Sequence, residues 1–216
     1  MTGQVIIGLS GSIGSGKTTV AKRLGEAHGF VRIGFAEILK QQVATTLRGT
    51  LKAYLRAVRP DIRTRDDLGG VDEDQWTQYL HTALWQTRDP VCRSLLQEWG
   101  TELRRAENPD YWVMQWEQMT MRFSRVVADD CRFVNEAEAI RRLGGFLVKV
   151  TRSGHEPAGS HVSEHALSAW TDWDLLLKND GDIEDLIVEA DRIAKIVLAM
   201  TKSVSMIPKG VASDSS

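Results

Sequence analysis

The residues with the clearest chemical potential are the eight from Gly11 to Thr18, which read Gly-Ser-Ile-Gly-Ser-Gly-Lys-Thr. They fill the phosphate-loop pattern G-x-x-x-x-G-K-[ST] at every fixed position. An apolar segment, 4–9, precedes them and a segment of helical composition, 17–28, follows them. Glycines let successive backbone N–H groups converge on phosphate oxygens, and the helix N-terminus adds a partial positive charge. The pattern therefore predicts a binding site for nucleotide phosphates.

Each residue type in this loop indicates a particular contact. Lys17 is expected to reach the β- and γ-phosphates, and the Thr18 hydroxyl is expected to help hold Mg²⁺. Asn179 follows the last predicted strand, and the active sites of parallel sheets lie at the carboxyl ends of their strands. The residues expected to contact ATP are Gly11, Ser12, Ile13, Gly14, Ser15, Gly16, Lys17, Thr18, Thr19 and Asn179.

Phosphoryl transfer also needs a metal and further cations, and strand ends supply candidates for both. Asp129 and Asp130 end the predicted strand 125–130, and side-chain alternation lets only one of them face the phosphate loop. Arg132 and Arg152 also stand at strand ends, where a planar guanidinium suits phosphate oxygens. We expect both arginines to act in catalysis with Lys17 and one of the two aspartates.

Length and composition favour a single α/β domain. The chain has 216 residues, of which 42% are hydrophobic and 26% are charged. Its net charge is -2, so no basic field indicates nucleic-acid binding, and no apolar run approaches the roughly 20 residues of a membrane span. Cys92 and Cys131 lie far apart in the sequence, which favours neither a disulfide framework nor a zinc site and indicates a reducing cytoplasm.

Alternating strand and helix patterns predict a three-layer fold of the phosphate-loop NTPase class. A five-stranded parallel sheet with helices on both faces is expected, with strands at 4–9, 30–35, 125–130, 146–150 and 173–177. Helices are expected at 17–28, 36–58, 76–88, 90–105, 110–122, 135–143 and 182–200. We treat 1–202 as one domain with a mobile insertion at 59–90 and a lid at 152–169, and 203–216 as a disordered tail. The three lid histidines, His155, His161 and His165, are expected to be solvated.

Three further segments narrow the interpretation. They are Gly34-Phe35-Ala36-Glu37-Ile38-Leu39-Lys40, the run from Leu96 to Arg105 that contains Gln97-Glu98-Trp99-Gly100-Thr101-Glu102, and Asp130-Cys131-Arg132-Phe133-Val134-Asn135-Glu136. Together with the phosphate loop they resemble the bacteriophage deoxynucleoside monophosphate kinases, in the same order along the chain. The resemblance implies transfer of the γ-phosphoryl group of ATP to deoxynucleoside 5′-monophosphates with Mg²⁺, a helical insertion that binds the monophosphate, and small-molecule nucleotides as the binding partners.

The resemblance also assigns residues. Thr18 and Asp130 would hold the metal, which is why Asp130 is preferred over Asp129. The residues that would bind the acceptor nucleotide are Phe35, Lys40, Gln97, Gly100, Thr101, Arg104, Asn135, Glu136 and Glu164, and the flat ring of Trp112 is added to them as a face for the base. A homodimer is compatible with the sequence, which leaves the oligomeric state open. A cytoplasmic location, in the host if the source is a virus, is also expected.

Two other interpretations compete with this one. A dephospho-coenzyme A kinase usually carries an Asp-Ala-Asp segment after the second strand, where this chain has Ile33-Gly34-Phe35-Ala36. A regulatory protein that binds nucleotide without turnover would not need Lys17, Asp130 and the strand-end arginines together, because binding alone does not require cations for a transition state.

Overall fold

The chain forms an α/β structure built on a parallel sheet. The computed structural model describes residues 4–58, 78, 81–86, 96–155 and 165–205. Five strands, β1 (Val5–Ser10), β2 (Val31–Arg32), β3 (Arg125–Ala128), β4 (Phe146–Thr151) and β5 (Leu175–Lys178), pair in the order β2-β3-β1-β4-β5. Every pair of neighbours is parallel. The predicted fold class is confirmed, and the central position of β1 places the loop after it in the middle of the carboxyl edge.

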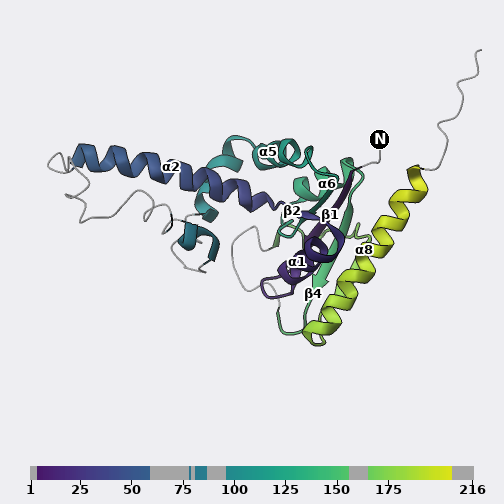
Figure 1. The fold of residues 1–216 in the computed structure, drawn as a ribbon. Helices are drawn as coiled ribbons and strands as arrows, with labels where there is room; N and C mark the ends of the chain where they lie inside the picture. The colour runs from purple at the N-terminus through teal and green to yellow at the C-terminus, as the bar shows by residue number, and fades with distance from the viewer. Residues whose placement is uncertain (1–3, 59–77, 79–80, 87–95, 156–164, 206–216) are drawn as a thin grey trace, which may run out of the picture. The chain divides into compact units, whose positions relative to one another are not determined.

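Helices cover both faces of this sheet. Helix α1 (Lys17–His28) and helix α8 (Ile183–Ser205) lie side by side along one face (Figure 1), where Ile7 and Leu9 of β1 pack among their buried side chains. Helix α6 (Val134–Arg142) packs on the other face, against β1 and β4. The alternation of side chains along β1 thus supplies apolar groups to two layers.

The ends of α1 follow directly from the sequence. Gly16 and Gly29 flank the helix with positive φ angles of 106° and 69°, and the Gly29 N–H donates to the Gly25 carbonyl. Glycine adopts this left-handed conformation without steric cost. The predicted bounds of this helix, 17–28, are confirmed.

Contacts divide the chain into two compact units, residues 1–35 with 115–216 and residues 36–114. The first unit holds the sheet. The second holds most of α2 (Phe35–Val58), the short π-helices η2 (Thr82–Gln86) and η3 (Glu98–Arg105), and the start of α5 (Tyr111–Thr120). Its apolar cluster is centred on Val43, Ala44 and Leu84.

Several predicted bounds differ from the structure. Strand β2 has two residues instead of the six predicted, and α8 continues to Ser205, three residues into the predicted tail. Of the helix predicted at 76–88, the structure describes Gln78 and His81 as helical and Thr82–Gln86 as η2. Of the helix predicted at 90–105, it describes 96–97 as α-helical and Glu98–Arg105 as η3. Most of the predicted insertion 59–90, half of the predicted lid and the rest of the tail lie outside the described residues.

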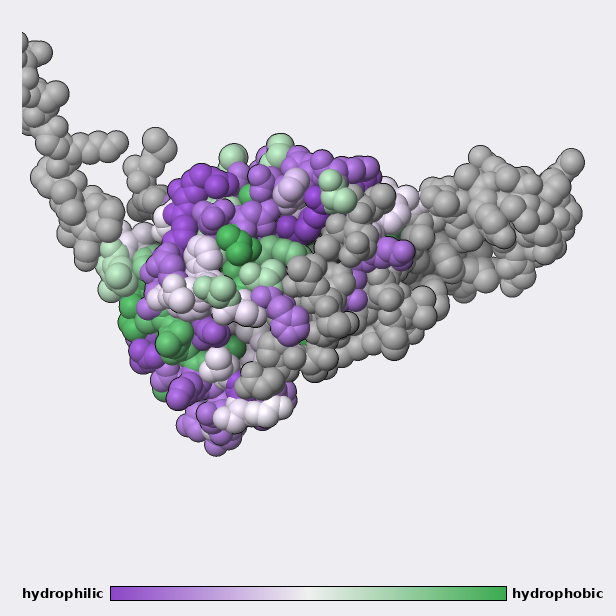
Figure 2. All heavy atoms as spheres, turned by 180° about the vertical axis from the view of Figure 1, so that it is seen from behind, coloured by the Kyte–Doolittle hydropathy of each residue, from purple (hydrophilic) through white to green (hydrophobic). Residues whose placement is uncertain are grey.

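The surface combines hydrophilic and hydrophobic side chains. On the face shown in Figure 2, hydrophilic side chains surround smaller hydrophobic areas. None of the helices in the described ranges combines the length and the apolar composition that crossing a membrane would need.

Candidate active site

The loop between β1 and α1 has the backbone of an anion cradle. Gly11, Gly14 and Gly16 have φ angles of 149°, 82° and 106°, in the range that favours glycine. A Cβ atom on Gly11 would lie 2.0 Å from the carbonyl oxygen of Val150, and one on Gly16 would lie 2.6 Å from Nδ2 of Asn179. The loop therefore passes too close to the ends of β4 and β5 to carry side chains at these positions.

Two side chains hold this loop in shape. The Lys17 ammonium donates to the carbonyl oxygens of Gly11 and Ser12, both at 2.7 Å, and lies 3.3 Å from the Ser15 hydroxyl. The buried Asn179 amide donates to the Ser15 carbonyl at 2.9 Å. Lys17 thus binds the backbone at the start of the loop, and Asn179 binds the backbone near its end.

A buried carboxylate faces the start of α1. The Thr18 hydroxyl donates to Oδ2 of Asp129 at 3.2 Å, and Nε of Arg32 donates to Oδ1 of Asp129 at 2.9 Å. Asp129 is only 5% exposed. Hydroxyl and carboxylate oxygens are the ligands that Mg²⁺ prefers, so this pair fits the metal that a phosphate loop uses. The described residues hold no cluster of three or more His, Cys, Asp or Glu side chains suited to a metal, so phosphate and water oxygens would supply the remaining ligands.

Asp130, the aspartate preferred from the sequence, lies in a different setting. Its Oδ1 accepts the Phe35 N–H at 2.8 Å, and its carboxylate packs so closely on Gly34 that a Cβ there would lie 2.6 Å from Oδ2. Side chains alternate along a strand, and the two aspartates that follow β3 continue this alternation, since they bind partners in different segments. The structure therefore places Asp129 beside Thr18 and uses Asp130 to fix the backbone that follows β2.

The segment after β3 forms the N-terminus of α6. Oε2 of Glu136 accepts the backbone N–H groups of Arg132 at 2.7 Å and Phe133 at 3.1 Å, which caps the helix. Glu136 is 2% exposed, so its carboxylate is committed to this cap, and Asn135 beside it is half-buried. Burial, together with the nearby carboxylates of Glu136 and Asp130, raises the pKa of the Cys131 thiol well above its usual value. The thiol is therefore protonated and unreactive near neutral pH.

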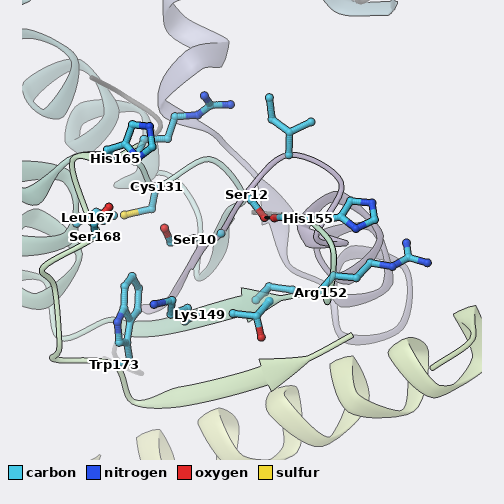
Figure 3. Close-up of a pocket in the computed structure, with 15 residues that line it drawn as sticks. Ser10, Ser12, Cys131, Lys149, Arg152, His155, His165, Leu167, Ser168 and Trp173 are labelled. Carbon is cyan, nitrogen blue, oxygen red and sulfur yellow. Dashed lines mark hydrogen bonds between the residues drawn. The ribbon is translucent and has the colours of Figure 1, made fainter. Parts of the chain in front are cut away.

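A pocket of about 450 Å³ adjoins the phosphate loop (Figure 3). Both predicted catalytic arginines, Arg132 and Arg152, line it. The other lining residues are Ser10, Gly11, Ser12, Ile13, Cys131, Lys149, Val150, Thr151, His155, His165, Leu167, Ser168 and Trp173. The pocket thus brings together the carboxyl ends of β1 and β4, the segment after β3 and part of the predicted lid.

The turn after β4 lies directly on the loop. The Ser12 hydroxyl donates to the His155 carbonyl, and the His155 ring packs against Gly14, where a Cβ would lie 2.6 Å from it. The same turn is held by Asp180, which accepts the Ser153 N–H at 2.8 Å, and this hydrogen bond lowers the pKa of Asp180. His155, expected to be simply solvated, is exposed but contacts the phosphate loop.

Phe35 and Trp112, predicted as flat faces for a base, are both buried. Phe35 is 3% exposed and stacks on Trp116 with ring centroids 4.6 Å apart, and the Trp116 indole N–H donates to the Ile33 carbonyl at 2.8 Å. Trp112 is 2% exposed and meets Tyr111 edge to face. Their geometry is that of core aromatics, and the base contacts predicted for them have no support from it.

Other residues predicted to bind the acceptor lie in the second unit. Arg104 has its guanidinium 5.5 Å from the Tyr111 ring and 6.0 Å from the Trp99 ring, and it pairs with Glu107 at 3.2 Å. Lys40 and Gln97 are half-buried on α2 and just before η3. Gly100 and Thr101 belong to the backbone of η3, and Glu164 lies outside the described residues. These contacts with an acceptor stay predictions.

Sequence reasoning missed Arg32, Lys149 and Trp173. Arg32 and Lys149 stand at or near strand ends on the same edge as the loop, which is a signal that could have marked them. Trp173 precedes β5, and its sequence context gives no such signal.

A central phosphate loop, a buried carboxylate on its Thr and a five-stranded parallel sheet of this order define a nucleotide-binding protein of the phosphate-loop class. Residues 60–189 match the family model described as "Deoxynucleotide monophosphate kinase". A protein of Acanthamoeba polyphaga mimivirus that carries this name provisionally is 31% identical over 184 residues, covering 84% of this chain and 91% of that protein. The deoxynucleotide monophosphate kinase of Enterobacteria phage T4 is 27% identical over 132 residues, covering 58% of this chain and 48% of the phage protein. The chain belongs to the deoxynucleotide monophosphate kinase family.

Proposed function

We propose that this protein transfers the γ-phosphoryl group of ATP to the 5′-phosphate of deoxynucleoside monophosphates. The observation that carries the proposal is the Lys17, Thr18 and Asp129 constellation in a chain of this family. The products would be ADP and a deoxynucleoside diphosphate. We also infer a cytoplasmic location, since the reaction consumes ATP and the sequence indicates a reducing compartment.

The loop would hold the donor. Backbone N–H groups of residues 11–18 and the N-terminus of α1 would bind the β- and γ-phosphates, with Lys17 as the point charge between them. Mg²⁺, when bound, would neutralise charge on the phosphate oxygens. Arg132 and Arg152, which line the adjoining pocket, would stabilise the charge that develops on the transferring group.

Asp129 is proposed as the carboxylate that organises the metal, in place of Asp130. It is the aspartate that accepts a hydrogen bond from Thr18, and its burial keeps bulk water from competing for its oxygens. Arg32 would hold this carboxylate in its orientation before the metal binds.

The acceptor is proposed to be a deoxynucleotide rather than a ribonucleotide. The names of both related proteins support this choice, as does the sequence from Gln97 to Arg104. A pocket fitted to C2′ without a hydroxyl would reject the ribose form by clash and by leaving its hydroxyl without a partner.

Kinetics on matched acceptors test this proposal. We expect kcat/KM for dGMP over GMP, and for dUMP over UMP, to differ by roughly ten- to two-hundred-fold. Equal values within each pair would remove the deoxy preference and leave the kinase. Activity confined to dephospho-coenzyme A would replace the function with that of the alternative kinase, and ATP binding without turnover would indicate the regulatory alternative.

A further inference from the structure

Lys149 occupies an unusual place for a lysine. It lies in β4 and is paired in register with Ser10, the last residue of β1. Two residues earlier, Gly8 and Leu147 are paired in the same way and lie against Ile140 of α6. Because side chains alternate along a strand, Ser10 and Lys149 share the sheet face that α6 covers. Lys149 is consequently half-buried, and its side chain lines the pocket beside the phosphate loop.

No acid among the described residues compensates the charge of Lys149. Its ammonium lies 5.8 Å from the centroid of the Trp173 ring, and no ion pair joins it to any described residue. The described residues that line the pocket include no Asp or Glu, while Arg132 and Arg152 add two more cations. A half-buried cation without a carboxylate is costly, and an anionic ligand would remove that cost.

Hydrogen bonds fix the position of the Trp173 ring that lies beside this ammonium. Its indole N–H donates to the Trp170 carbonyl at 2.8 Å. The next residue, Asp174, accepts the Leu147 N–H and the Arg141 guanidinium, both at 2.6 Å. These bonds tie the segment before β5 to β4 and α6. Figure 3 shows Trp173 and Lys149 together at one side of the pocket, so the ammonium is positioned before any ligand arrives.

We propose that Lys149 binds the phosphate of the acceptor nucleotide and that Trp173 is its positioning residue. The inference rests on the proposed function. The pocket shares Gly11 and Ser12 with the loop but does not include Lys17 or Thr18, so it adjoins the cradle assigned to the phosphates of ATP and extends beyond it. It also contains both arginines proposed to act on the transferring group. Phosphoryl transfer needs cations around the acceptor phosphate as well as around the donor, and these three side chains would supply them.

Kinetics of three variants test the assignment. Lys149→Gln is expected to raise the KM for deoxynucleoside monophosphates about tenfold or more while the KM for ATP changes less than about twofold. Lys149→Arg should restore part of the loss, because it keeps the charge. Lys195→Gln, which removes an exposed lysine of α8, is the matched control and should leave both constants unchanged.

Thermal unfolding with ligand supplies a readout that does not need turnover. A mixture of the four deoxynucleoside monophosphates should raise the Tm of the wild type and of Lys195→Gln, and raise that of Lys149→Gln much less. Trp173→Leu should weaken the same shift, and it should add little to Lys149→Gln in the double variant.

The remaining outcomes decide either against the assignment of Lys149 or against the proposed function. An unchanged acceptor KM and an unchanged shift in Lys149→Gln, with only a lower Tm, would make Lys149 a structural partner of Trp173. A rise in the KM for ATP alone would assign it to the donor. If the wild type transfers no phosphoryl group but monophosphates still stabilise it through Lys149, the pocket stands and the proposed function fails.

Discussion

The arrangement around Thr18 makes a sharp prediction about two neighbouring aspartates. The two carboxylate oxygens of Asp129 accept hydrogen bonds from the Thr18 hydroxyl at 3.2 Å and from Arg32 at 2.9 Å. In Asp129→Asn the amide has one oxygen, so only one of these two hydrogen bonds can be kept. A hydrogen bond to a charged group contributes about 1.5–3 kcal/mol, and the negative charge that faces the metal is lost as well. A barrier higher by about 2–4 kcal/mol corresponds to a loss of roughly 30- to 900-fold in kcat.

Asp130→Asn is the matched control for this change. An asparagine there keeps an oxygen that can accept the Phe35 N–H, so we expect less than about a tenfold loss. The assay is ADP release with saturating ATP and monophosphates over a range of Mg²⁺ concentrations. Asp129→Asn should also need more Mg²⁺ for half-maximal rate. A larger loss in Asp130→Asn than in Asp129→Asn, with both variants equally stable, would refute the reasoning.

Two further predictions concern catalysis and stability. Lys17→Ala should lower turnover more than tenfold with little change in Tm, since water can satisfy the carbonyl oxygens of Gly11 and Ser12 to which Lys17 donates; retention of more than about a tenth of the wild-type kcat would contradict this. Asp191→Asn should lower the Tm at pH 7, because hydrogen bonds from Arg23 and then His28 hold the pKa of Asp191 well below its usual value. A carboxylate whose pKa is depressed by folding stabilises the folded state fully above its unfolded pKa, near 4, and this stabilisation is lost progressively as the pH falls below that value. The Tm difference between Asp191→Asn and the wild type should therefore shrink by pH 3. Glu189→Gln, the control, should change the Tm little at either pH.

Local signals in the sequence accounted for the sheet and for α1. Gly16 and Gly29 mark the ends of α1 by conformations that other residues avoid, and the predicted bounds match. Strand β2 was predicted too long, because apolar composition does not show that Asp130 takes the Phe35 N–H out of the ladder. The helices predicted at 76–88 and, from Pro90, at 90–105 were expected without regard to type, since a helical composition does not distinguish an α-helix from the π-helices η2 and η3.

The candidate site was predictable where chemistry and position coincide in one motif, as in Lys17 and Thr18. The choice between Asp129 and Asp130 depended on which side chain turns toward α1, and a sequence cannot give that for two adjacent residues beyond a strand. Lys149 was overlooked because a lysine in a strand is usually solvated, and only the structure shows it half-buried with Trp173 as its partner.

The most direct test of the central claim follows a labelled phosphoryl group. Purified protein, Mg²⁺ and γ-labelled ATP are incubated with each of the four deoxynucleoside monophosphates, with dephospho-coenzyme A and with no acceptor, and the products are separated. We predict label in a deoxynucleoside diphosphate from at least one monophosphate, in amounts equal to the ADP formed, and loss of that product in Lys17→Ala. Label found only in coenzyme A, or no transfer to any of the four monophosphates by a protein that binds ATP, would contradict the account.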